Sequence, residues 1–287
     1  GTATNRGVDV ACDANGNVFI TGLFSGNITF GSTYSNTILN AVFTVKYDSS
    51  GSEQWYRRIG AGLSNTATGI SVDNNGNVYV LGDFKGSPTI FNTPNTTFSG
   101  TYDNGVFVVK YSNSGATLLS TTSSSDGALN ARDIAIDSAQ NIYVVGDFDC
   151  THSDYSDLYG EAIFNSVGFK DVFITKFSAN GSLDYARQYA SKNNDYGRGI
   201  VIKAEDQPIV TGSFQDTLNV PSNDNFLTSN LNNWIPLGCG SNNGYCGDAF
   251  YGTFHGMPST GGSDVFVMNV FDENRSPYDY YERSGSG

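Results

Sequence analysis

Short runs of alternating apolar and polar residues recur along the chain, and each run ends in a polar turn. In one stretch, "GISV" at residues 69–72 and "NVYVLGDF" at residues 77–84 flank Asn75-Gly76. A period of two in β-branched and aromatic residues is typical of β-strands with one buried face. Asn-Gly supplies the positive φ angles of a two-residue hairpin loop. The pattern therefore predicts a β-hairpin.

A second hairpin pattern alternates with the first. "VFVVKY" at residues 106–111 and "ATLLSTT" at residues 116–122 flank the polar turn "SNSG". The first pattern begins near residues 7, 67, 131 and 197, and the second near residues 41, 105, 171 and 264. Two hairpins per unit give four strands, and the chain contains four such units.

The spacing of the units indicates how they assemble. Ile70 follows Val10 by 60 residues, Ile134 follows Ile70 by 64, and Ile200 follows Ile134 by 66. Four-stranded units at such a spacing are typical of a β-propeller, in which neighbouring blades cover one another. We expect an all-β chain with one propeller domain, in which the blades span approximately residues 1–62, 63–126, 127–193 and 194–287.

The number of blades in the complete ring has two interpretations. The chain begins and ends in the same phase of the repeat, so no strand is left to join the first blade to the last. Either four blades close without such a clasp, which we expect, or the four blades are part of a larger propeller.

The repeated pattern resembles a known family. "D-x-x-G-N-V-Y-V-x-G-x-F" followed by "V-F-V-V-K-Y" and "G-x-x-x-W" is similar to the SBBP repeat, a β-propeller repeat common in exported bacterial proteins. The resemblance covers all four units. In the third unit Gln140 replaces the turn glycine, and in the fourth Lys203 and Asp206 replace the aspartate and the glycine. The resemblance implies a fold and an exported protein, and it implies no reaction.

Composition and charge narrow the classes of partner. Glycine (34), tyrosine (17) and phenylalanine (19) are abundant, only 15% of residues are charged, and the formal net charge is −13. Such an acidic surface repels phosphate backbones and anionic lipids, so we expect neither nucleic acid nor membrane-surface binding. No run of 18 apolar residues is present, so we expect no membrane insertion. The acidic groups either hold Ca²⁺ or keep the protein soluble.

The connections between the second and third strands predict a binding face. From the glycine that ends the second strand to the phenylalanine that begins the third, the four gaps are 21, 25, 27 and 54 residues. The fourth unit therefore carries a long insertion at residues 225–262, and all of these loops share one face, where the third and fourth are expected to meet. Six candidate ligand-binding residues lie in the insertion: Trp234, Tyr245, Phe250, Tyr251, Phe254 and His255. Aromatic rings among amide side chains suit a sugar or a protein surface; alternatively, they pack on one another as a plug.

Carboxylates are concentrated in the third of these loops. The stretch "DFDCTHSDYSDLYGE" begins at Asp147 and contains four candidate metal ligands: Asp149, Asp154, Asp157 and Glu161. Ca²⁺ takes six to eight oxygen ligands, which a flexible acidic loop can gather. The spacing matches no EF-hand, and the alternative is a solvated acidic loop.

Three of the four cysteines have expected roles. Cys239 and Cys246 lie seven residues apart in the loop "CGSNNGYC", where they either form a disulfide, as suits an exported protein, or remain free thiols. Cys12 lies among alternating apolar residues, so we expect it to be buried.

Catalytic patterns are scarce. The two histidines, His152 and His255, fall in different loops and match no metal-binding motif. One candidate pair of carboxylates for polysaccharide cleavage is Asp157 with Asp248. The inventory favours a protein that is not an enzyme. Lysines recur at one position of the third strand, where we expect a structural role, pairing with the repeated aspartate: Lys46, Lys110 and Lys176.

The sequence therefore predicts a secreted or cell-surface propeller that serves as a binding, adhesion or scaffold module. Its partner would be a protein or a glycan on the long-loop face, within a larger surface assembly. The alternatives are a polysaccharide hydrolase or lyase using carboxylates on the same face, and a purely structural subunit of a surface layer or filament.

Overall fold

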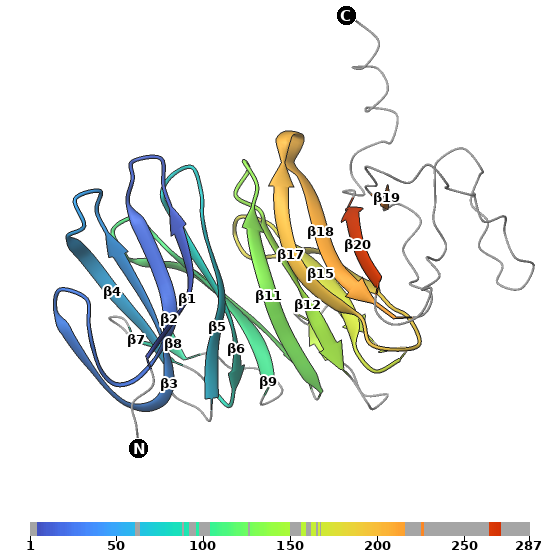
Figure 1. The fold of residues 1–287 in the computed structure, drawn as a ribbon, viewed down its shortest axis with the longest axis horizontal. Coiled ribbons are helices and arrows are strands. Elements are labelled where there is room, and N and C mark those ends of the chain that lie inside the picture. Colours follow the sequence, from blue (N-terminus) through green and yellow to red (C-terminus); the bar gives the residue numbers. More distant parts are fainter. Residues whose placement is uncertain are drawn as a thin grey trace, which may run out of the picture.

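The computed structural model consists almost entirely of antiparallel β-strands (Figure 1). It describes residues 5–60, 64–87, 89–91, 96–97, 104–125, 127–149, 156–158, 162–164, 166, 168–215, 225–226 and 264–270. Within these residues there is no helix long and apolar enough to cross a bilayer.

Each repeat unit forms one sheet, called a blade here. Blade 1 contains β1 (Arg6–Cys12), β2 (Val18–Thr29), β3 (Thr33–Tyr47) and β4 (Glu53–Gly60). Blade 2 contains β5 (Ser64–Val72), β6 (Val78–Lys85), β9 (Asn104–Tyr111) and β10 (Thr117–Ser125). Blade 3 contains β11 (Ala128–Ile136), β12 (Ile142–Asp149), β15 (Asp171–Phe177) and β16 (Leu183–Tyr189). Blade 4 contains β17 (Tyr196–Lys203), β18 (Gln207–Phe214), β20 (Asp264–Asn269) and the short β19 (Asn225–Phe226). The 3-10 turn η1 (Ala204–Asp206) joins β17 to β18.

The cores lie between the blades, as a propeller requires. Three buried clusters join blade 1 to blade 2, blade 2 to blade 3, and blade 3 to blade 4. In the last of these, Val172 and Ile174 of β15 pack with Val210 and Phe266 of blade 4. A single sheet cannot bury both of its faces, so each blade depends on its neighbours.

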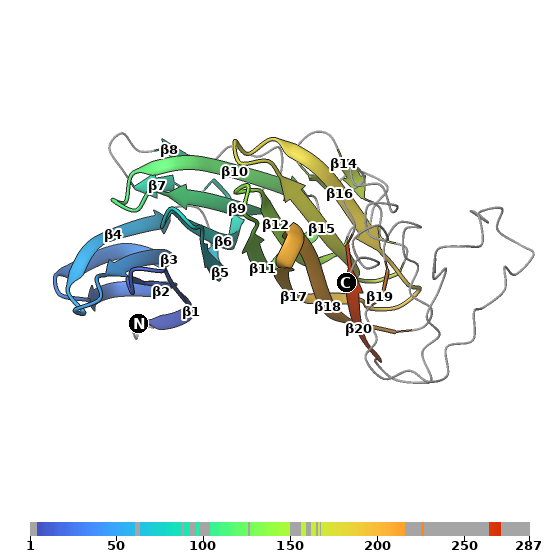
Figure 2. The ribbon, with the colours of Figure 1, turned by 90° about the horizontal axis from the view of Figure 1, so that it is seen from above.

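The blades follow one another along an arc (Figure 2). The first strands β1, β5, β11 and β17 line its concave side, and each contacts the next. Blade 1 and blade 4 lie at opposite ends of this arc. The predicted propeller fold is confirmed. The described residues form an open, partial ring and not the closed four-bladed ring that we expected.

The two end faces of the arc are covered differently. On blade 1, Phe30 from the extended β2–β3 hairpin packs against Phe43 with ring centroids 4.8 Å apart, and Tyr34 stacks on Tyr56 with ring centroids 3.7 Å apart. On blade 4, Val265 is 71% exposed and Val267 is 38% exposed.

The hairpin turns correct the expected loop length. Asp73 N donates to Asn77 O, and Gly76 N donates to Asp73 O, so three residues form the loop. Only Gly76 has a positive φ, of 74°, which corresponds to a type I turn followed by a left-handed residue. The type I′ loop that Asn-Gly favours would need positive φ at both residues, and the Asp73–Asn77 hydrogen bond encloses three residues, so the predicted two-residue turn is wrong. In the third and fourth units, Gln140 and Asp206 stand at the position of this glycine and adopt positive φ angles of 68° and 57°. The left-handed conformation is therefore kept where the glycine is replaced.

The connections between second and third strands reach the neighbouring blade. The connection in blade 2 forms β7 (Thr89–Phe91) and β8 (Thr96–Thr97), which extend blade 1 beyond β4. The connection in blade 3 forms β13 (Ser156–Leu158) and β14 (Ala162–Phe164), which extend blade 2 beyond β10. These segments act as β-strand additions at the outer edge of the preceding blade.

Candidate functional site

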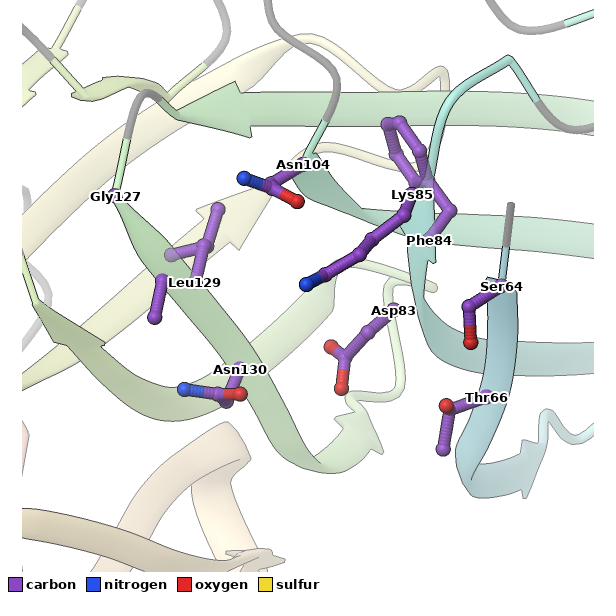
Figure 3. A pocket seen from close by; sticks show the side chains of 10 residues that line it. Ser64, Thr66, Asp83, Phe84, Lys85, Asn104, Gly127, Leu129 and Asn130 are labelled. Atoms are coloured by element: carbon purple, nitrogen blue, oxygen red, sulfur yellow. The ribbon is translucent and has the colours of Figure 1, made fainter. Parts of the chain in front are cut away.

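A pocket of about 440 Å³ lies between blade 2 and blade 3, at the face that carries the connections between second and third strands. Figure 3 shows its polar side chains directed into the same space. Ten residues line it: Ser64, Thr66, Asp83, Phe84, Lys85, Asn104, Gly127, Ala128, Leu129 and Asn130.

The strand register places the polar groups of blade 2 in one patch. Thr66 pairs with Asp83, and Ser64 and Asn104 both pair with Lys85 on β6. Because alternate residues of a strand share a face, Asp83 and Lys85 lie on the side of β6 that carries Tyr79 and Leu81.

The same face of blade 2 is apolar further along the strands. Tyr79, Leu81, Val106 and Val108 are buried against blade 3. The face becomes polar only where the strands reach the edge of the sheet. The interface between the two blades therefore opens into a polar hollow at this edge.

Most of these polar groups have unused hydrogen-bonding capacity. Among the described residues, Lys85 is exposed and its ammonium forms neither an ion pair nor a hydrogen bond. The side chains of Ser64, Thr66 and Asn104 likewise make no hydrogen bond to a described residue. Several unengaged donors and acceptors in one concave space are typical of a site for a polar ligand.

Asp83 is the most perturbed carboxyl group in this region. Its Oδ1 accepts a hydrogen bond from Ala131 N at 2.7 Å, so it also joins blade 2 to blade 3. Burial raises the pKa of Asp83 to about 7, an effect that the Ala131 hydrogen bond and Arg132 oppose. A carboxyl group with such a pKa changes protonation near neutral pH.

The equivalent residue of blade 3 has a different environment. Asp147 accepts from Arg132 Nε at 2.7 Å, from Lys170 Nζ at 2.9 Å and from Asn130 Nδ2 at 3.0 Å. These partners hold Asp147 within its own blade. Asp83, in contrast, faces the pocket.

A second hollow, of about 240 Å³, lies at the opposite face among the turns of blades 2, 3 and 4. Asp73, Asp137, Lys203 and Asp206 are among its lining residues. Asp73 and Asp137 are engaged in their own turns, and Asp206 accepts from Ser138. Within the part of the chain that the structure describes, no group of three or more histidine, cysteine, aspartate or glutamate side chains is placed to hold a metal ion.

Most of the predicted site residues lie outside the described residues. This holds for the six candidate ligand-binding residues of the insertion, for Cys239 and Cys246, and for Asp154, Glu161 and Asp248. Asp149 is half-buried at the end of β12, and the backbone of Asp157 pairs with Ser124 across β13 and β10. The calcium, disulfide and carboxylate-pair hypotheses therefore stay predictions.

Two smaller expectations are tested. Cys12 is an exposed free thiol, so its predicted burial is wrong: it ends β1, where the sheet reaches solvent. Among the described residues, an ion pair within 4.0 Å between a repeated lysine and the repeated aspartate occurs in blade 2, where Lys110 Nζ lies 3.6 Å from Asp73 Oδ2. Lys46 instead donates to Asn113 of the next blade, and Lys176 lies 3.5 Å from Asp184.

Sequence reasoning missed the pocket, although the repeats contain a signal for it. The residues equivalent to Asp83 and Lys85 differ in the other units. They are Leu23 and Ser25 in the first, Asp147 and Asp149 in the third, and Ser213 and Gln215 in the fourth. Only blade 2 combines a carboxylate with a cation at these positions. Between blades 1 and 2, Leu23 packs against the apolar cluster, so the equivalent position is apolar.

The fold defines a class of protein: a β-propeller built from repeated four-stranded blades. Residues 54–83 match the family model described as a β-propeller repeat, SBBP. The chain is also 29% identical over 154 residues to an uncharacterized WD repeat-containing protein of Acanthamoeba polyphaga mimivirus. That match covers 48% of this chain and 11% of the viral protein, so the chain spans about a tenth of its relative's length.

The comparison with solved structures gives a weak match. It is the crystal structure of a protein of unknown function from Bacteroides caccae, with a TM-score of 0.38 and 11% identity. The match covers 75% of this chain and 56% of that chain.

Proposed function

We propose that this chain is a carbohydrate-binding propeller module and that the pocket between blades 2 and 3 is its recognition site. The observation that carries the proposal is the convergence of Lys85, Asn104, Ser64 and Thr66, which have no described partners, on one 440 Å³ hollow. Sugars present many hydroxyl groups, each of which donates and accepts, and such groups match amides and hydroxyls.

The shape of the site supports a small unit of a glycan. The pocket lies within the range of volumes that bind small molecules. Leu129, from the cluster between blades 2 and 3, supplies an apolar wall, against which the C–H face of a sugar ring can pack. The paired strands β5, β6 and β9 hold these polar groups, which reduces the ordering needed on binding.

We also propose that the module works in an extracellular or cell-surface setting, where glycans are accessible. The similarity to a repeat common in exported proteins supports this setting. The long insertion at residues 225–262 is rich in aromatic and amide side chains, and its candidate ligand-binding residues stay a separate prediction for a glycan or a protein partner.

A glycan array followed by calorimetry tests the proposed function. We expect the wild-type protein to bind one class of oligosaccharide and Asn104→Ala and Thr66→Val to weaken that binding at least about fivefold, because each loses a hydrogen bond in a desolvated site. Asn15→Ala is the matched control, since Asn15 is exposed in the β1–β2 turn at the opposite face. Binding that is equally strong in all three variants would exclude this pocket as the site, and an absence of glycan binding would exclude the proposed function.

A further inference from the structure

We propose that the pocket between blades 2 and 3 takes a sugar acid, whose carboxylate lies between the Lys85 ammonium and the Asp83 carboxyl group. This inference rests on the proposed function and specifies its ligand. Figure 3 shows both side chains directed into the same space; they lie two residues apart on β6 and therefore on the same face of the strand.

The first observation is that Lys85 and Asp83 do not pair with each other. No ion pair within 4.0 Å joins them, and Lys85 has no other described partner. An exposed lysine that lines a pocket without a protein anion is available to an anion of the ligand. A carboxylate between the two side chains would accept from the lysine and, when Asp83 is protonated, from the aspartic acid.

The second observation is the local charge. Charged groups of blade 3 act electrostatically on Asp83: Arg132 of β11, Asp147 of β12 and Lys170, which precedes β15. Together with Lys85, this group contains three cations and the two carboxyl groups of Asp147 and Asp83. Its net charge is +1 when both carboxyl groups are ionised and +2 when Asp83 is protonated. The protein as a whole carries −13. A positive spot on such an acidic chain favours an anionic group at this position.

The third observation concerns the groups around the proposed carboxylate. Asn104 and Ser64 flank Lys85 across the strands, and Thr66 lies opposite Asp83. These neutral groups match the ring hydroxyls of a sugar. A simple anion such as phosphate would leave them unused, so the lining favours a molecule with a carboxylate and hydroxyls together.

Recognition at this site should depend on pH. Burial raises the pKa of Asp83 to about 7, so the group is largely protonated at pH 6 and largely ionised at pH 8.5. A sugar carboxylate, with an ordinary pKa near 4, stays ionised throughout this range. The ionised aspartate repels the bound carboxylate, and the protonated acid donates a hydrogen bond to it. Binding therefore strengthens as the pH falls through about 7.

The experiment compares digalacturonate with its methyl ester, which keeps the rings and hydroxyls and lacks the charge. Calorimetry at pH 6.0 and 8.5 measures both sugars on the full chain. We expect the acid to bind at least about tenfold more tightly than the ester at pH 6.0, and to weaken about tenfold at pH 8.5, while the ester changes little.

Two variants separate the contributions. Asp83→Asn keeps an acceptor for Ala131 N and carries no charge, so its affinity for the acid should be the same at both pH values. Lys85→Met should bind the acid no better than the ester. Circular dichroism at both pH values confirms that each variant is folded.

The outcomes distinguish the inference from the proposed function. Equal affinity for acid and ester overturns the inference and leaves the proposed function standing. A preference for the acid that persists in Lys85→Met, or a pH dependence that persists in Asp83→Asn, also overturns the inference. An absence of binding by either sugar, together with an empty glycan array, overturns both.

Discussion

At the scale of single residues, one glycine in each blade makes room for an aromatic ring. In blade 2, a Cβ on Gly82 would lie 2.2 Å from Thr66 O and 2.4 Å from the Phe107 ring. The same arrangement joins Gly22 to Phe43, Gly146 to Phe173, and Gly212 to Phe266. The recurring glycine of the sequence motif is therefore a packing requirement.

The substitution Gly82→Ala tests this requirement. We expect it to lower the free energy of unfolding by at least about 2 kcal/mol, because backbone or a buried ring must move. Urea denaturation measures the change. Gly7→Ala is the control: a Cβ on Gly7 would meet nothing within 4 Å, and its stability should stay close to that of the wild type.

The residue scale also shows where sequence reasoning ends. Asp83 and Asp147 occupy the same place in "GDF" of two repeats, and this tripeptide by itself does not distinguish them. Their difference comes from Arg132, Lys170 and the adjacent blade. A pKa near 7 is therefore a property of the assembled interface, and the sequence could not predict it.

At the scale of elements, the turn between β5 and β6 is organised by one buried aspartate. Asp73 Oδ1 accepts from the backbone N–H groups of Asn75 and Asn77, each at 2.9 Å. Its Oδ2 accepts from the Asn77 side chain at 2.9 Å and from Tyr79 OH at 3.0 Å. Burial by itself would raise the pKa of Asp73, but these hydrogen bonds outweigh it and hold the pKa below its ordinary value of 3.8.

We expect Asp73→Ala to destabilise the protein by about 2–3 kcal/mol, because it leaves several buried donors without an acceptor. Since the folded pKa lies below the unfolded one, this stabilisation is complete above pH 3.8 and is lost as the pH falls through the folded value. Denaturation curves at pH 7 and pH 3 measure both effects. Asp48→Ala, in the exposed β3–β4 turn with the same backbone contacts, should cost less at pH 7; an equal loss would show that burial does not matter.

The elements themselves were largely predictable, because their pattern is local. The hairpins, their order and the four-unit repeat follow from alternation and turn residues. The pairing of β7 with β4 and of β13 with β10 could not be predicted in this way. These short segments have little hydrophobic pattern of their own, and they pair with a neighbouring blade. The turn type was also missed, since Asn-Gly fits both two- and three-residue loops.

At the scale of the whole molecule, stability depends on contacts between sheets that are distant in sequence. Each interior blade is buried on two faces, and backbone donors of one blade reach carboxylates of another: Ile70 N to Asp9, Ala131 N to Asp83 and Ile200 N to Asp133. The pocket lies at one of these interfaces, so the proposed site exists only when blades 2 and 3 are packed together.

The most direct test of this account compares one substitution at equivalent positions of two blades. Val172 of β15 is fully buried against blade 4, whereas Val265 of β20, which likewise precedes the recurring phenylalanine, is 71% exposed. Urea denaturation of Val172→Ala should show a loss of about 2 kcal/mol from two buried methyl groups, and Val265→Ala a loss under about 0.5 kcal/mol. Equal losses in the two variants would contradict the claim that neighbouring blades form the core of this protein.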